Sequence, residues 1–349
     1  MRGSAQTGRG ATVKSLLKRN EFYLAALIFL LCVAITAANP SFLTLENVLS
    51  FLKTSSVNGI FAVGVLFVLI LGGTPDVSFT AIAQVVEYVV VMATLRWGGD
   101  IGLALLGACV LGALMGSVNG FIIHYFRVTT IVVTIATLNV YYGMLYVLTG
   151  GNVIFVVHPM FKQFASILLF PMHGANGSIY GVSMMPLMWL GVLILGWFIL
   201  RRTFLGRAIF AMGGNEVAAE RIGVNTLWTR VFVFSFVGLL SGVAAIAHAT
   251  IVLSAIPNII VGHELEVIAA VVLGGASLFG GKGTIVGTFL GVLLFAVLKN
   301  GLVLLNFSSY WYDVTIGIAI TVGITVSAYQ QLRAERSRVN VDVEPAAAS

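Results

Sequence analysis

Polar side chains recur at helical spacing in two otherwise apolar stretches of the sequence. The spacings are four, four and three residues in the first set and four, three and four in the second, so each set lies on one face of a helix. We expect these faces to line the route of a small hydroxylated substrate, with hydrogen bonding between packed helices as the alternative. The sets are Asp76, Thr80, Gln84 and Glu87, and Thr130, Thr134, Thr137 and Tyr141.

Glu87 is the only carboxylate that is expected near the middle of an apolar stretch. A charge that faces lipid at that depth costs at least ~2.5 kcal/mol, so we expect Glu87 to be paired or hydrated. One buried glutamate could also be a proton site. A secondary transporter driven by protons or sodium is therefore a function to weigh, although such proteins usually contain several ionisable groups at membrane depth.

The sequence contains no motif typical of an enzyme or an ATPase. There is no Gly-rich phosphate loop of the G-x-x-x-x-G-K-[ST] type, so the chain is not expected to bind ATP itself. The five histidines are scattered along the chain, without the spacing of a metal site or a catalytic triad. We therefore expect no metal, no cofactor and no enzymatic activity.

The composition identifies the class of protein. Of the 349 residues, 59% are hydrophobic and only 9% are charged, which excludes a soluble globular protein and indicates a polytopic membrane protein. The net charge of +6 does not indicate nucleic acid as a partner, because the basic residues lie at the ends of apolar stretches. Cys32 and Cys109 both lie within apolar stretches, so no disulfide framework is implied.

The apolar stretches predict an all-α fold with ten transmembrane helices. The first could instead be a cleavable signal peptide, but its long hydrophilic lead and the spans that follow favour a retained anchor. The expected spans are Phe22–Ala38, Val48–Leu71, Val77–Leu95, Ile101–Ile123, Val128–Thr149, Pro186–Leu200, Val231–Leu253, Leu265–Phe279, Thr284–Leu304 and Tyr310–Ala328.

The basic residues predict the orientation of these spans. With the N-terminus inside, fifteen of the nineteen Lys and Arg residues lie on the cytoplasmic side. Both termini would then be cytoplasmic. Residues 1–21 would form a disordered lead-in, residues 22–328 a single transmembrane domain, and residues 329–349 a cytoplasmic tail.

The order of the spans suggests a five-plus-five inverted repeat. Val48–Thr149 and Val231–Ala328 each hold four spans, and Asn119-Gly120 recurs as Asn300-Gly301. An odd number of spans separates equivalent elements, so the two blocks cross the membrane in opposite senses. Glycines and a proline at 71–78, and glycines at 274–275 and 280–283, predict broken or re-entrant segments, with ordinary tight turns as the alternative.

One polar segment, residues 201–230, interrupts the apolar sequence and would lie in the cytoplasm. Asn215 can cap a helix of about two turns, and Gly223 can end that helix in the left-handed conformation. The apolar and small residues of this helix would project from it. A solvated connecting loop is the alternative. The residues expected to project are Val217, Ala218, Ala219 and Ile222.

Three blocks of sequence resemble permeases of bacterial ABC importers of the ribose/galactose type. The resemblance extends from about Phe22 to Ala328, and the block GGTPDVS has one residue more than the family's pattern. The blocks are GGNEVAAERIGV, which is similar to the loop that inserts into a groove of the ATPase, GGTPDVS, and GHELEVIAAVVLGGASLFGGKGTIVGTFLGVLL.

This resemblance implies a transmembrane subunit of an importer in the bacterial inner membrane. Its expected partners are a second permease copy or a paralogue, two cytoplasmic ATPase subunits that carry ATP and Mg²⁺, and an extracytoplasmic sugar-binding protein. The expected substrate is a small neutral sugar, with autoinducer-2 or a polyol as alternatives. The residues that would couple to the ATPase are Asn215, Glu216, Val217, Ala218, Ala219, Glu220, Arg221, Ile222 and Gly223.

Overall fold

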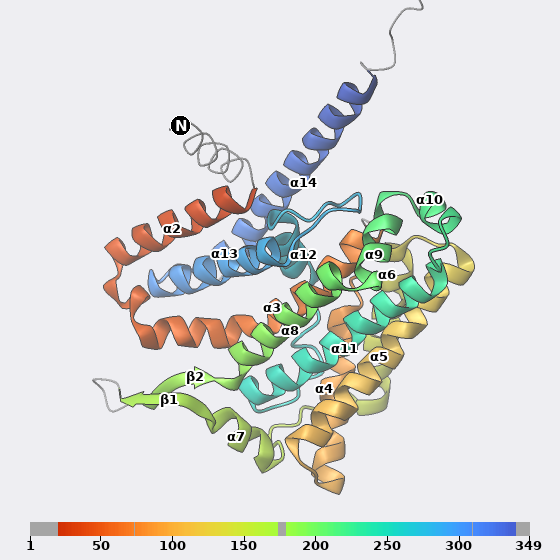
Figure 1. The fold of residues 1–349 in the computed structure, drawn as a ribbon. Helices are drawn as coiled ribbons and strands as arrows, with labels where there is room; N and C mark the ends of the chain where they lie inside the picture. The colour runs from red at the N-terminus through yellow and green to blue at the C-terminus, as the bar shows by residue number, and fades with distance from the viewer. Residues whose placement is uncertain (1–19, 73, 174–178, 309, 340–349) are drawn as a thin grey trace, which may run out of the picture.

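The computed structural model describes residues 20–72, 74–173, 179–308 and 310–339 (Figure 1). The expected lead-in therefore lies almost entirely outside the described residues. The elements are α2 Asn20–Ala38, the 3-10 helix η1 Pro40–Leu43, α3 Leu45–Gly72, α4 Phe79–Trp97, α5 Ile101–Phe126, α6 Thr130–Thr149, α7 Pro159–Ser166, β1 Leu168–His173, β2 Ile179–Ser183, α8 Met184–Arg202, α9 Phe204–Gly214, α10 Glu216–Arg221, α11 Thr226–Val252, α12 Glu264–Leu273, α13 Ile285–Leu304 and α14 Tyr310–Val339.

Eight helices of the described chain are long and apolar enough to cross a membrane. Each coincides with a predicted span, which confirms an all-α polytopic membrane protein. Outside these eight, the described chain contains the 30-residue helix α14, several short helices and one antiparallel hairpin, in which β1 pairs with β2. The eight helices are α2, α3, α4, α5, α6, α8, α11 and α13.

The predicted span Leu265–Phe279 is wrong. In its place α12 has ten residues, about 15 Å, which is half of the ~30 Å hydrocarbon core. The helix ends at the glycine pair, where Gly275 adopts φ +94°, a conformation that interrupts a helix. The apolar run that follows is a non-helical connection to α13. It is therefore one of the broken segments that the glycines predicted.

The last predicted span lies within α14, whose side chains are described only as far as residue 323 and at residue 325. The helix continues to Val339, so the expected tail at 329–349 is helical over its first eleven residues. The polar segment 201–230 also contains more helix than expected. Thr203 caps α9 by accepting a hydrogen bond from the Gly206 amide at 3.1 Å, and α9 precedes α10.

Helix contacts support the internal repeat. In the first block α4 contacts α5, α6 and α11, and in the second block α12 contacts the equivalent helices α13, α14 and α3. The two starting helices, α3 and α11, contact each other at the centre of the bundle. The blocks differ in the second element, because α4 has 19 residues and α12 has ten, and in the last, because α6 has 20 residues and α14 has 30.

Glycines bring α5 and α11 into backbone contact. A Cβ atom added at Gly112 would lie 2.1 Å from the carbonyl oxygen of Gly238, and one added at Gly116 would lie 2.1 Å from the carbonyl oxygen of Phe234. No larger residue fits without moving one helix, so these glycines set the spacing between the two halves of the molecule. Small residues serve the same purpose in other membrane bundles.

The two ends of the bundle differ. Helices α9 and α10 lie at one end, and α7 with the β1–β2 hairpin lies at the other (Figure 1). The described chain begins and ends on the side of α10, where α2 starts and α14 finishes.

Candidate functional site

The polar stripe of α4 is fully enclosed by protein. Asp76 is 1% exposed, and Thr80, Gln84 and Glu87 are 0% exposed. Asp76 lies in the segment before α4, where its carboxylate accepts hydrogen bonds from the amide and the hydroxyl of Ser78 at 2.7 Å. The other three face the second half of the chain. The stripe thus faces the subunit interior and not lipid.

Gln84 holds the non-helical segment that precedes α12. Its Nε2 donates to the carbonyl of Ile256 at 2.8 Å, and its Oε1 accepts from the amide of Ile260 at 2.8 Å. One side-chain amide therefore satisfies two backbone groups that have no helical partner, which a buried chain segment requires. This segment enters the bundle because α4 supplies those hydrogen bonds.

Glu87 is paired, as predicted. Its Oε2 lies 2.6 Å from Nδ1 of His248 on α11, and the side chain of His248 is 16% exposed. The second oxygen, Oε1, has no hydrogen-bond partner in the described chain. The pair connects α4 to α11 with one carboxylate oxygen left available.

Two further carboxylates, Glu264 and Glu266 at the start of α12, are buried in the bundle. Glu264 accepts from the Gly262 amide at 3.0 Å and from the hydroxyl of Thr80. Glu266 accepts from Asn58 at 2.8 Å. Because Asn58 is near the middle of the 28-residue α3, about 20 Å from each end, Glu266 lies near mid-bilayer.

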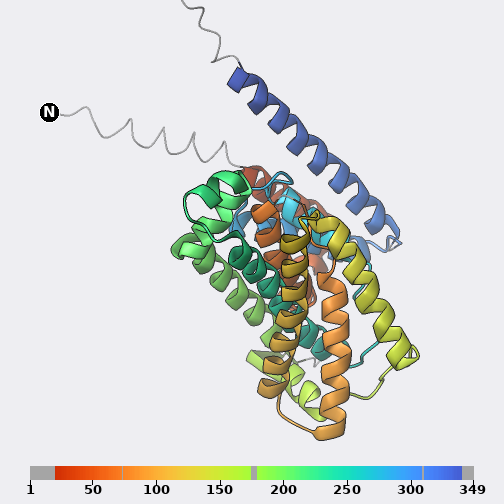
Figure 2. The same cartoon turned by 90° about the vertical axis from the view of Figure 1, so that its right-hand side faces the viewer.

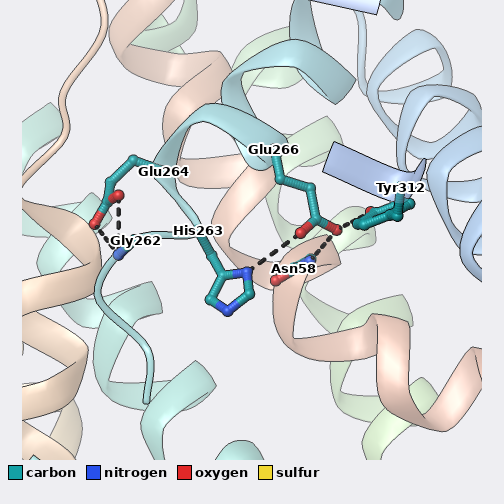
Figure 3. A network of polar contacts seen from close by, with 6 residues as sticks. All are labelled: Asn58, Gly262, His263, Glu264, Glu266 and Tyr312. Carbon is teal, nitrogen blue, oxygen red and sulfur yellow. Dashed lines mark hydrogen bonds and ion pairs between the residues drawn. The ribbon is translucent and has the colours of Figure 1, made fainter. Parts of the chain in front are cut away.

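Glu266 is the centre of a polar network (Figure 3). The hydroxyl of Tyr312 donates to its Oε1 at 2.5 Å, and Nδ1 of His263 lies 3.3 Å from its Oε2. Three separate elements, α3, α12 and α14, thus meet at one carboxylate. Buried charges of this kind are tolerated where each oxygen has donors.

A small cavity adjoins this network. It has a volume of about 30 Å³, enough for about one water molecule. Its polar lining residues offer hydroxyl, amide, carboxylate and ammonium groups, and Lys299 is exposed. The polar lining residues are Thr54, Ser55, Asn58, Glu266 and Lys299.

The second polar stripe, on α6, is only partly enclosed. Thr134 is buried, and its hydroxyl accepts from the Val77 amide at 3.3 Å. Tyr141 is half-buried and donates to the carbonyl of Met115 at 3.1 Å. Thr130 and Thr137 are half-buried. The two stripes meet at the segment before α4, through the hydrogen bond between Val77 and Thr134.

The short helix predicted after Asn215 is present as α10. Asn215 caps α10, accepting from the Ala218 amide at 2.9 Å, and Gly223 follows the helix at φ +89°. Val217 is 59% exposed and Ile222 is 76% exposed. Two apolar side chains thus project from a helix at the end of the molecule.

Ala219 does not project, contrary to expectation. It is 2% exposed, because this side of α10 faces α9 and α11. Glu216 of α10 also forms an ion pair with Arg230 of α11 at 2.7 Å. The helix is therefore attached to α11, the first helix of the second block.

Helix α9, which precedes α10, contacts the end of α3 and the non-helical segment after α12. A Cβ atom added at Gly213 would lie 1.7 Å from the carbonyl oxygen of Ile70, near the end of α3. The same carbonyl accepts from the amide of Gly281 at 2.9 Å. The end of α3, α9 and the segment after α12 are therefore in backbone contact.

The relatives of this chain are import permeases, not enzymes. The ribose import permease protein RbsC of Bacillus subtilis (strain 168) is 36% identical over 85% of this chain and 89% of its own length. RbsC of Escherichia coli (strain K12) is 34% identical over 93% of this chain and 98% of its own. The galactose/methyl galactoside import permease protein MglC of Escherichia coli (strain K12) is 31% identical over 91% and 96%.

These relatives confirm the resemblance to ribose and galactose permeases. No solved structure matches the chain. The family model described as "Branched-chain amino acid transport system / permease component" matches residues 47–323, and the chain belongs to this family of membrane permeases.

Proposed function

We propose that this chain is the transmembrane permease subunit of an ATP-driven importer of a small neutral sugar or a sugar-like molecule. The observation that carries the proposal is the identity of 31% to 36% with ribose and galactose import permeases over most of the chain. The importer would lie in the inner membrane, with both termini cytoplasmic. A second permease copy or a paralogue, and an extracytoplasmic binding protein, would complete it.

ATP and Mg²⁺ would bind to separate cytoplasmic ATPase subunits, and α10 would dock on them. The exposed side chains of Val217 and Ile222 suit a hydrophobic groove on such a partner. Movement of α10 would reach α11 through the Glu216–Arg230 ion pair, and α3 through the contact of α9 with Ile70. Both central helices, α3 and α11, would then move. Helix α11 would pass this movement to α4, because His248 on α11 contacts Glu87 on α4.

The passage would open along the polar groups of α4 and α6. Opening requires the segment before α12 to leave Gln84, which breaks two hydrogen bonds, and Glu264 to leave Thr80. A hydroxylated substrate can replace those hydrogen bonds, whereas an apolar one cannot. A sugar, a polyol or autoinducer-2 therefore fits the same chemistry.

A secondary transporter is the second candidate, because three carboxylates and two histidines lie at or near membrane depth. The test is reconstitution of the permease with its ATPase subunits and binding protein in vesicles without an ion gradient. Uptake of labelled ribose or galactose should then require ATP. Uptake by the permease alone, driven by a proton or sodium gradient, would contradict the proposal.

A further inference from the structure

A second cavity opens on the outside of the bundle, between α4, α5 and α6. Its volume is about 500 Å³, and it lies on a different face of α4 from the polar stripe. The three helices face the viewer in Figure 2, with α4 between the other two. Three methionines, Met92, Met115 and Met144, form part of its wall.

This second cavity, called the crevice from here on, spans the depth of one leaflet. Along α4 it extends from Val85 to Trp97, twelve residues or about 18 Å. Its inner end is level with Met115, near the middle of α5, and its outer end lies at the ends of α4 and α6. Half of the ~30 Å hydrocarbon core is about 15 Å, so the crevice extends from mid-bilayer to the interface.

The wall is apolar, and its hydroxyl groups are already used. Tyr88 donates to the carbonyl of Asn152 at 3.0 Å, Tyr141 to the carbonyl of Met115 at 3.1 Å, and Thr149 to the carbonyl of Leu145 at 2.7 Å. A sugar would find few free hydrogen-bonding partners along it. A hydrocarbon chain needs none.

The one charged residue that lines the crevice, Arg96, lies at its outer end. Arg96 lies in the last turn of α4, is exposed, and forms no ion pair within the described chain. Trp97 beside it is 79% exposed. Tryptophan and arginine are typical of the membrane interface, where Arg pairs with phosphate through parallel hydrogen bonds.

We propose that this crevice binds a phospholipid, with one acyl chain along α4 and α6 and the phosphate paired with Arg96. An apolar groove of leaflet depth with a free cation only at its interfacial end matches an amphiphile with an anionic headgroup. A helix from a second copy of the chain would fill the groove without using that cation. The inference is independent of what the permease transports.

The test counts phospholipid retained by the full-length protein in native mass spectrometry, after purification in detergent and addition of phosphatidylglycerol. The wild type and Arg96→Lys, which preserves the charge, should each retain one phospholipid per chain more than Arg96→Ala. Met144→Trp, which fills the groove, should lose the same lipid. Val147→Trp places the same side chain on α6 outside the crevice, at a residue that is 84% exposed, and should behave as wild type.

Arg96→Ala removes the charge, and Met144→Trp fills the apolar groove, so the two variants alter different features of the site. If one of them fails to fold, the other still tests the proposal. Equal phospholipid counts in all five proteins would overturn the proposal. So would a disulfide between two chains carrying Met144→Cys in intact membranes, because a second copy would then cover the crevice.

Discussion

His248 Nδ1 on α11 lies 2.6 Å from the carboxylate of Glu87 on α4, and this contact joins the two halves of the molecule in the interior of the bundle. Removing one partner of a buried pair leaves the other uncompensated and costs about 3–5 kcal/mol. We therefore predict that His248→Leu lowers the free energy of unfolding by about that amount. Thermal unfolding of the detergent-purified protein measures the change.

The double variant Glu87→Leu with His248→Leu is the matched control for this pair. With both polar groups removed, most of the stability should return, because no buried charge is left without a partner. If the losses of the two single variants simply add in the double variant, the pair is not an energetic unit.

The hydrogen bonds of Gln84 predict that the α4 stripe is closed at rest and open during transport. In a cysteine-free background, Gln84→Cys should react with a small hydrophilic thiol reagent only when the ATPase is turning over. Mass spectrometry of the labelled chain measures the reaction. Equal labelling at rest would show an open channel, and no labelling under any condition would show that the stripe only packs helices together.

Substitutions in α10 should separate docking from folding. Ile222→Asp adds a charge at an exposed site, so the permease should insert normally while binding of the ATPase subunits and uptake fall. Ala219→Asp buries a charge and should destabilise the permease itself. Co-purification of the ATPase and thermal unfolding distinguish the two. Lys162→Ala, at an exposed site on α7 at the other end of the bundle, is the control that should leave both unchanged.

The opposite ends of the bundle should be reached from opposite sides of the membrane. Single cysteines at Asn215, beside α10, and at Asn152, after α6, should react with an impermeant thiol reagent from the inside and the outside respectively. Labelling of Asn215→Cys in intact cells would reverse the proposed orientation.

The glycine contact between α5 and α11 predicts a sharp size limit. A Cβ atom at Gly238 would lie 2.0 Å from the carbonyl oxygen of Gly112, so Gly238→Ala should cost about 1–3 kcal/mol through overpacking. Gly191→Ala, on the exposed face of α8 with no atom within 4 Å, should be neutral or slightly stabilising. Because alanine favours the helix over glycine, similar losses in both variants would show that the close contact at Gly238 does not set the effect.

Local signals made part of this structure predictable. Long apolar runs identified eight membrane helices, and the polar residue Asn215 followed by Gly223 identified a capped helix of the correct length. The face of α4 was also predictable, because helical periodicity depends only on neighbouring residues. These features need no knowledge of which helices touch.

Tertiary contacts determine what the sequence could not show. The length of α12 depends on the non-helical segment held by Gln84, and the burial of Ala219 depends on how α9 and α11 pack against α10. Glu266 gathers partners from residues 58 and 312, which no local pattern connects. One available signal was Glu264 and Glu266, which flank Leu265 where a span would normally begin with apolar residues.

The short length of α12 has a consequence for biosynthesis. A ten-residue helix that begins with two glutamates is too short to be recognised by the insertion machinery as a membrane segment in its own right. Besides Gly262 and His263 just before the helix, its carboxylates have partners on α3, α4 and α14. Residues 253–284 should therefore enter the bilayer after the segments on both sides have inserted, and the folded first half acts as the template on which the second half is completed.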